Sequence, residues 1–198
     1  MSVNQLAANI FQDLIGELFD RKVMGNLYRP HYVERLVVKG LGEGFSLTSA
    51  DWSGWDIEHS CGVRIEVKQS AALQTWTGRE SVNGRTTPGS FDIAPRTGYF
   101  DGGSTLWVKH PGRPAQIYIF AWHPITELDV CDQRDPAQWR FFVTPACELP
   151  EKQKTISRRV VETRWSAVGF DELRNALLGA IDALKHSHPI SGSEGSLL

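Results

Sequence analysis

A short segment around residue 60 constrains the fold most, because it predicts a β-hairpin whose register can be derived. The segments 55–59 and 63–69 alternate polar and apolar residues, as half-buried strands do, and Ser60-Cys61-Gly62 joins them. A three-residue hairpin loop places a glycine at its last position, where the backbone is left-handed, and Gly62 meets that requirement. His59 is therefore predicted to pair with Val63.

Counting back from this pair places Asp56 directly opposite Glu66. Because side chains alternate along a strand, Asp56, Glu66 and Lys68 then share one face of the hairpin. The opposite face, predicted to be buried, carries the apolar residues Trp55, Ile57, Ile65 and Val67.

Two carboxylates at directly opposed positions of a hairpin need a cation. Their Cβ atoms lie about 4.5–5.5 Å apart, and the charges repel each other unless a positive charge lies between them. Mg²⁺, for which Mn²⁺ should substitute, satisfies that demand with oxygen ligands, and the Val67 carbonyl is a candidate further ligand. Lys68 would then orient a water or neutralise charge developing on a phosphate. The alternative is an exposed strand face on which Lys68 bridges two acids.

The rest of the chain predicts an α/β (α+β) fold with a mixed β-sheet flanked by helices. Leu6, Ile10, Leu14 and Leu18 recur at helical spacing, and two later segments do the same. The segment 116–122 is almost continuously apolar, as a central strand covered on both faces would be. The predicted helices are 4–22, 30–39, 170–186 and a short one at 70–76, and the further predicted strands are 45–50, 91–94, 116–122 and 139–144.

Length and composition predict one domain, residues 1–186, followed by a flexible tail, residues 187–198. The 198 residues are 41% hydrophobic, enough for a core without disulfides or metal staples. Three cysteines are an odd number without zinc-ligand spacing, which fits a reducing cytoplasm. No basic segment followed by an apolar run opens the chain, and the longest apolar stretch, 117–122, is too short to cross a bilayer. We therefore expect a cytoplasmic protein with no membrane partner.

The motif pieces Gly54-Trp55-Asp56 and Glu66-Val67-Lys68-Gln69, after a helix that carries a Glu, resemble the PD-(D/E)XK, or restriction-endonuclease-like, nuclease superfamily. The resemblance implies an αβββαβ-type core, with Asp56 and Glu66 as metal ligands and Lys68 as the catalytic lysine. It also implies that Gln69 lines the site. The sequence departs from the family pattern in two places. Trp55 stands where proline is common, and no long helix is evident between residues 70 and 114.

The resemblance further implies a helix-one glutamate in the site, as a metal ligand and catalytic residue, and Glu17 is the choice. It lies three residues from Leu14 and one from Leu18, at the edge of the apolar stripe, where a carboxylate needs a partner. Glu34, in the second helix, is the weaker alternative.

A cation-rich stretch predicts where DNA would bind. The formal net charge of −2 gives no general attraction to polyanions, but residues 79–113 carry several cations and few acids. The predicted phosphate contacts are Arg79, Arg85, Arg96, Lys109 and Arg113, and Trp52 and Trp76 are candidates for stacking on bases. A solvated variable loop and partly buried tryptophans are the alternatives. Trp107, Trp122, Trp139 and Trp165 are predicted core residues.

Taken together, the residues and the resemblance predict a Mg²⁺-dependent deoxyribonuclease that acts in restriction, phage defence or repair. DNA is the expected partner, and a homodimer is left open. Two other classes of function remain: a nucleic-acid-binding module of the same fold without metal or catalysis, and an unrelated small-molecule α/β enzyme or toxin–antitoxin partner.

Overall fold

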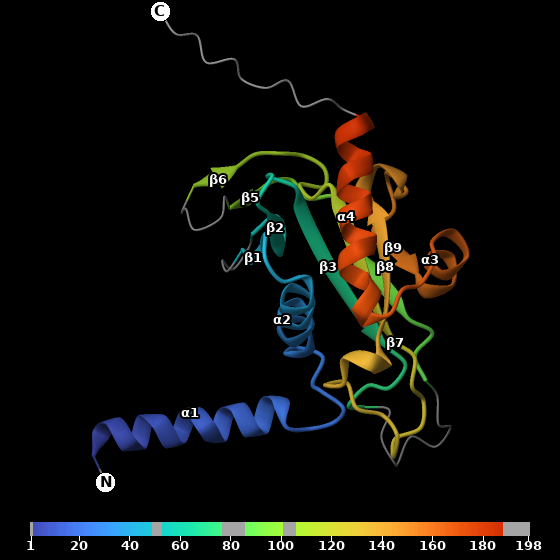
Figure 1. Ribbon diagram of the computed structural model, residues 1–198. Helices are drawn as coiled ribbons and strands as arrows, with labels where there is room; N and C mark the ends of the chain where they lie inside the picture. Colours follow the sequence, from blue (N-terminus) through green and yellow to red (C-terminus); the bar gives the residue numbers. More distant parts are fainter. Residues whose placement is uncertain (1, 49–52, 77–85, 101–105, 188–198) are drawn as a thin grey trace, which may run out of the picture.

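A five-stranded mixed sheet in the order β1-β2-β3-β7-β8 forms the centre of the computed structural model, which describes residues 2–48, 53–76, 86–100 and 106–187 (Figure 1). The strands are β1 (Phe45–Leu47), β2 (Ile57–His59), β3 (Arg64–Ala71), β7 (Ile117–His123) and β8 (Arg140–Pro145). The first three form an antiparallel meander, β7 pairs parallel with β3, and β8 pairs antiparallel with β7. The predicted mixed sheet flanked by helices is confirmed at this level.

The predicted hairpin register is confirmed. Ile57 pairs with Ile65, and the backbone N–H of His59 donates to the Val63 carbonyl at 2.9 Å. Gly62 has φ of 85°, the left-handed conformation that the loop demands. A local turn rule was sufficient here, because the turn fixes the register without help from distant residues.

The prediction that Trp55 shares a face with Ile57 is wrong. Strand β2 begins only at Ile57, so strand alternation does not reach Trp55. Ile57 packs beneath the helices, whereas Trp55 belongs to the core on the opposite side of the sheet, where its ring meets Tyr99 at 5.3 Å. The Arg64 guanidinium lies 3.9 Å from the Trp55 ring centroid.

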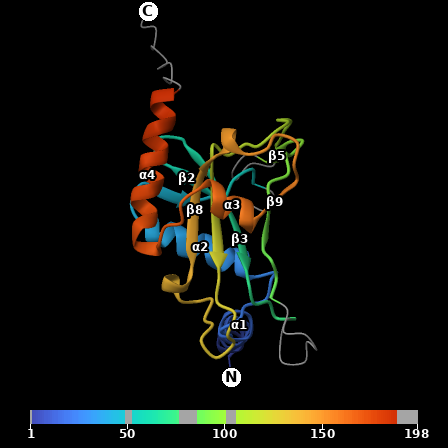
Figure 2. The same ribbon diagram turned by 90° about the vertical axis from the view of Figure 1, so that its right-hand side faces the viewer.

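Helices α2 (Arg29–Leu41) and α4 (Phe170–Ser187) cover one face of the sheet (Figure 2). The α2 residues Val33, Val37 and Leu41 are fully buried there. They occupy helical positions i, i+4 and i+8, which is why this stripe meets the sheet. From α4, buried Leu173, Leu177 and Ile181 join the same core.

The other face is covered by the two-stranded sheet of β4 (Ser90–Asp92) and β9 (Thr155–Ser157), together with α3 (Arg158–Arg164). Phe91, Ile156 and Val161 pack there with Phe120 of β7. Every residue of β7 is buried, which confirms the predicted central strand.

Several short elements lack a periodic signal in the sequence. They are β5 (Tyr99–Phe100), β6 (Trp107–Val108), β9, α3 and the 3-10 turns Pro136–Gln138 and Ala146–Glu148. The predicted helix at 70–76 is wrong, because β3 continues to Ala71, which pairs with His123 of β7. The predicted tail overlaps α4 at residue 187, and residues 188–198 lie outside the described part of the chain.

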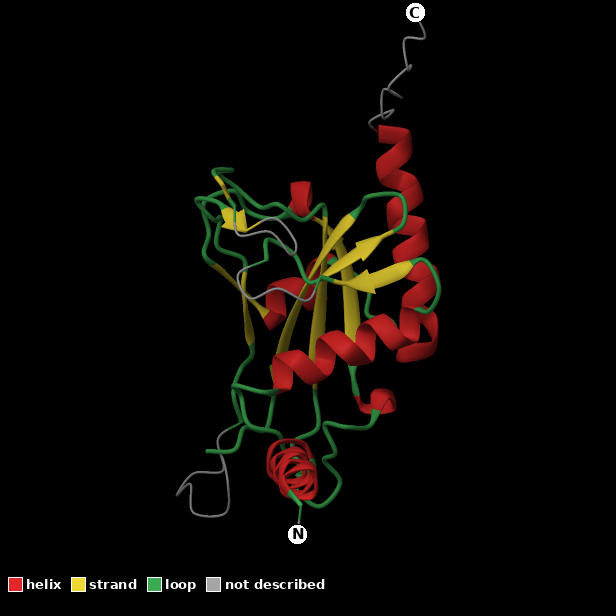
Figure 3. Ribbon diagram, turned by 90° about the vertical axis from the view of Figure 1, so that its left-hand side faces the viewer, coloured by secondary structure: helices red, strands yellow, loops and turns green. Residues whose placement is uncertain are grey.

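Helix α1 (Val3–Phe19) projects from the body below the sheet, and Figure 3 shows it end-on, separate from the helices that cover the sheet. The predicted helix is confirmed, but none of its residues is buried. In the ranges that the structure describes, no helix combines the length and hydrophobicity needed to span a membrane.

Candidate active site

Asp56 lies just before β2 and binds the edge of β3 with its side chain. Its Oδ2 accepts a hydrogen bond of 2.7 Å from the Val67 backbone N–H. Because β2 begins one residue later, a carboxylate occupies the place that a strand carbonyl would otherwise take. The N–H and C=O of one strand residue point to the same side, so the Val67 carbonyl also faces this edge.

Glu66 and Lys68 project from the same face of β3, as predicted, and form an ion pair with each other. Their side chains are only 13% and 23% exposed, so the pair lies in a partly dehydrated environment. In such surroundings a carboxylate and an ammonium influence each other more strongly than they would on a surface.

Burial and neighbouring charges shift the pKa values of the acids and of the lysine in this site. Burial, followed by the neighbouring Asp56, raises the pKa of Glu66 to about 7 despite Lys68. Burial also raises the pKa of Asp56 to about 6, and the charge of Glu34 adds to the rise while Lys68 opposes it. Burial lowers the pKa of Lys68, but Glu66 and Asp56 outweigh it, so the net shift is upward and the amine stays protonated at neutral pH.

Glu34 of α2 is the helix carboxylate that reaches this site. Its pKa is raised by burial, with Lys68 lowering it and Glu66 raising it, so its charge interacts with both. Glu17, the predicted helix-one residue, instead lies exposed on α1. Both glutamates stand at the edge of an apolar stripe, but only the stripe of α2 packs against the sheet, and Glu34 therefore replaces Glu17 in the candidate site.

A cleft of about 530 Å³ opens beside this cluster. Glu66 and Lys68 line it, and across from them stands an exposed ion pair in which Arg96 Nη2 lies 3.1 Å from Asp92 Oδ2. The remaining lining residues are Ser53, Gly54, Ile93, Ala94, Thr97, Gly98, Tyr99, Trp107, Pro114 and Tyr118. Trp107, predicted to be a core residue, is 50% exposed and lines the cleft, because its neighbour Val108 faces the core and successive strand residues alternate. Trp122 and Trp139 are buried as predicted, and Trp165 is partly buried.

The predicted phosphate contacts lie in different surroundings. Arg96 lines the cleft and lowers the pKa of Glu66, and Lys109 is exposed just after β6. Arg113 instead donates to the carbonyls of Ile93 and Pro150, both at 2.7 Å, so its guanidinium cross-links two loops and we withdraw it as a phosphate contact. Trp76 is exposed beyond the end of β3, outside the residues that line the cleft. Arg79, Arg85 and Trp52 lie outside the described residues.

Gln69 lies on the opposite side of β3 from Lys68, because successive strand residues alternate. Its Oε1 accepts a 2.6 Å hydrogen bond from the buried Arg29 of α2, whose other donors bind Gln74 and Asn26. Gln69 thus fixes α2, the helix that carries Glu34, to the sheet. This structural role corrects the prediction that Gln69 lines the site.

No preformed set of three His, Cys, Asp or Glu ligands is present among the described residues. The ion pair of Glu66 with Lys68 and the hydrogen bond of Asp56 to Val67 engage the two central carboxylates. Among known proteins, no family model and no curated protein sequence matches this chain.

Proposed function

We propose that the chain is a divalent-metal-dependent deoxyribonuclease with a PD-(D/E)XK core. One observation carries the proposal: Glu66 and Lys68 line a cleft, and their charges interact with those of Asp56 and of Glu34, which lies on a helix that precedes the sheet. The order of the elements supports it, because α2 leads into the antiparallel meander β1-β2-β3, and β7 follows in parallel.

The donor set fits a hard divalent cation. Asp56, Glu66 and the Val67 carbonyl offer oxygen atoms, which Mg²⁺ and Mn²⁺ prefer, and Glu34 supplies a further carboxylate nearby. Burial is the first cause of the raised pKa values of Asp56 and Glu66, and a divalent cation bound beside them would stabilise their ionised forms. When bound, the metal would lower the pKa of a coordinated water and polarise a phosphoryl oxygen.

Lys68 acts in this proposal as a cation rather than a base, because its ammonium form is favoured by both neighbouring acids. A rigid strand holds it two residues from Glu66, within reach of any phosphate that enters the cleft. Positioned there, the ammonium would stabilise negative charge as it develops during water attack on phosphorus.

The cleft lining suits a nucleic-acid backbone. Arg96 offers a guanidinium whose present partner, Asp92, is exposed and exchangeable for a phosphate, and Lys109 is a further exposed cation just after β6. Such contacts position a duplex without reading its sequence. The half-exposed Trp107 adds a flat surface on which a base can stack.

A metal-free DNA-binding module of the same fold is the second candidate. The observation that favours it is the lack of three converging ligands in the described ranges. Calorimetric titration with Mn²⁺ separates the two candidates: the nuclease binds the metal and loses that binding in Asp56→Ala, whereas the module shows no binding in either protein.

Plasmid cleavage tests the proposal directly. Supercoiled DNA with millimolar Mg²⁺ or Mn²⁺ should be nicked or linearised by the wild type, and Lys68→Ala should lower the rate by about 100- to 1,000-fold. Lys39→Ala is the matched control, since Lys39 is exposed on α2. Equal rates for wild type and Lys68→Ala, or loss of cleavage in the control, would reject the assignment of Lys68 to the reaction.

A further inference from the structure

The apolar face of α1 is exposed to water along the whole helix. Its residues are Val3 (82% exposed), Leu6 (46%), Ile10 (50%), Phe11 (60%), Leu14 (48%) and Ile15 (41%). They fall on one side of the helix, while Gln5, Asn9 and Gln12 occupy the other. A contiguous apolar patch of this length on a single element marks an interaction surface.

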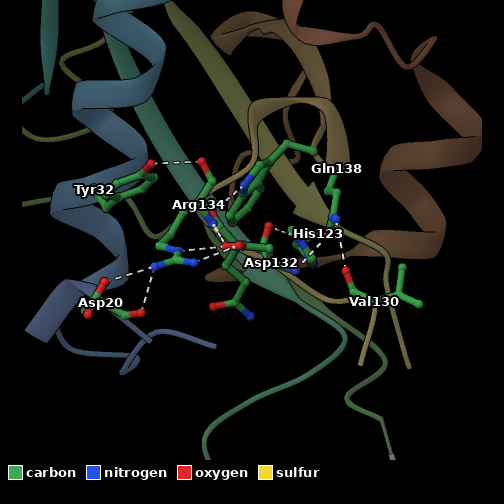
Figure 4. Close-up of polar contacts among 9 residues, drawn as sticks. Asp20, Tyr32, His123, Val130, Asp132, Arg134 and Gln138 are labelled. Carbon is green, nitrogen blue, oxygen red and sulfur yellow. Dashed lines mark hydrogen bonds and ion pairs between the residues drawn. The ribbon is translucent and has the colours of Figure 1, made fainter. Parts of the chain in front are cut away.

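The contacts that attach α1 to the body lie at its C-terminal end. The Phe19 ring meets Tyr28 and Tyr32 of the following segment, both at 6.4 Å between centroids. Arg134 Nη1 donates to the Asp20 carbonyl at 2.7 Å and is itself held by Asp132, as Figure 4 shows. The anchored end fixes the direction of the helix and leaves its apolar face projecting from the body.

A helix of 17 residues in this position gains stability from a partner. Isolated helices shorter than about 12–15 residues are marginal in water, and α1 is only slightly longer. This one contains Val3, Ile10, Ile15 and Gly16, whose helix propensity is low to moderate. Covering its apolar face would therefore add to the free energy that keeps α1 helical.

The charges of α1 select the kind of partner. The helix carries two acids, Asp13 and Glu17, in its C-terminal half and no Lys or Arg. A helix that lies on an anionic membrane carries cations on its polar face, so lipid is a poor match. An identical helix packed antiparallel fits: the acidic half of each copy then faces the uncharged N-terminal half of the other, where the helix dipole favours negative charge.

We propose that α1 pairs with α1 of a second copy of this chain, antiparallel and about a two-fold axis near Ile10. Leu6 then packs against Leu14 of the second copy, and Ile10 packs against Ile10 at the axis. One pair of 17-residue helices makes a small interface compared with most specific ones, so we expect a weak, reversible dimer.

Sedimentation velocity over about 1–100 µM tests the pairing. The wild type should pass from monomer to dimer, and Ile10→Glu should raise the dissociation constant by more than about 100-fold, because it places two carboxylates opposite each other at the centre of the apolar interface. Gln12→Glu makes the same charge change on the exposed polar side and should leave the dimer intact. A wild type that stays monomeric at 100 µM, or equal weakening by both variants, overturns the proposal.

Disulfide trapping tests the orientation. In a background where the exposed Cys61 and Cys147 are replaced by serine, a mixture of Leu6→Cys and Leu14→Cys proteins should cross-link as heterodimers. Neither protein alone should cross-link, since equivalent residues lie about 12 Å apart along an antiparallel pair. Efficient self-cross-linking of Leu6→Cys would overturn the antiparallel arrangement, and stronger binding to phosphatidylglycerol vesicles than to a second copy would overturn the partner.

Discussion

Helices α1 and α2 have similar sequence patterns, but only the apolar stripe of α2 is buried in the structure. Each has an apolar stripe at helical spacing and a glutamate at the edge of that stripe. In α2 the stripe of Val33, Val37 and Leu41 is fully buried against the sheet, whereas no residue of α1 is buried.

The difference shows that an amphipathic pattern predicts which face of a helix is apolar, but not what packs against that face. Burial of α2 brings Glu34 close enough to Lys68 and Glu66 for their charges to shift its pKa. Glu17 occupies an equivalent place on α1 and is exposed, because no part of the sheet covers that helix. Which glutamate belongs to the candidate site therefore depends on which helix packs against the sheet.

The largest expected effect is on stability and contrasts one substitution in the two helices. Leu41→Ala should lower the free energy of unfolding by about 2–5 kcal/mol, because it opens a cavity beside the sheet. Leu14→Ala should change it by less than about 0.5 kcal/mol when the protein is dilute enough to be monomeric. Urea unfolding followed by tryptophan fluorescence reports on the body, because α1 contains no tryptophan. Equal losses would mean that α1 packs on the body in solution.

The second contrast concerns cleavage of DNA. Glu34→Gln should slow metal-dependent cleavage by about 100-fold, or about 2.7 kcal/mol in activation free energy, because a carboxylate beside the metal site becomes neutral. Glu17→Gln makes the same change on α1 and should leave the rate within a factor of two or so of wild type. Plasmid nicking at saturating Mn²⁺ measures both. The opposite ranking would restore Glu17 to the site and remove Glu34.

Local rules predicted the parts of the fold that are set by neighbouring residues. The hairpin register followed from Gly62 alone, and the buried strand β7 followed from its unbroken apolar run. Pairing between strands that are far apart in the chain produces no comparable local pattern in the sequence. The continuation of β3 to Ala71 depends on β7, some fifty residues later, and the sequence around residue 71 favoured a helix instead.

The candidate site likewise contains residues that local patterns predicted and residues whose roles depend on distant partners. Asp56, Glu66 and Lys68 were placed together from the sequence because all three belong to one hairpin. The roles of Gln69 and Arg113 depend on partners far away in the chain, Arg29 and the carbonyls of Ile93 and Pro150, and no local pattern reports them.

The smallest expected effect is a pH dependence of stability, and it again compares a substitution of Glu34 with one of Glu17. A carboxyl whose pKa is raised by folding holds its proton more tightly in the folded state, so it costs nothing at low pH and destabilises the fold as the pH rises. Asp56 and Glu66, with pKa values of about 6 and about 7, should impose that cost between about pH 4, where carboxyls of the unfolded chain ionise, and about pH 7.

Glu34 contributes to this cost twice, because its own pKa is raised by burial and its charge raises that of Asp56. Glu34→Gln should therefore gain on the order of 1 kcal/mol relative to wild type between pH 5 and pH 8 in EDTA. In millimolar Mn²⁺ the order should reverse, since the cation stabilises the ionised acids of the wild type and binds the folded state. Glu17→Gln should run parallel to wild type in both buffers. Urea unfolding across this pH range decides the point: a Glu34→Gln curve that stays parallel to wild type in EDTA would place Glu34 outside the charge cluster and leave Asp56 and Glu66 without a helix partner.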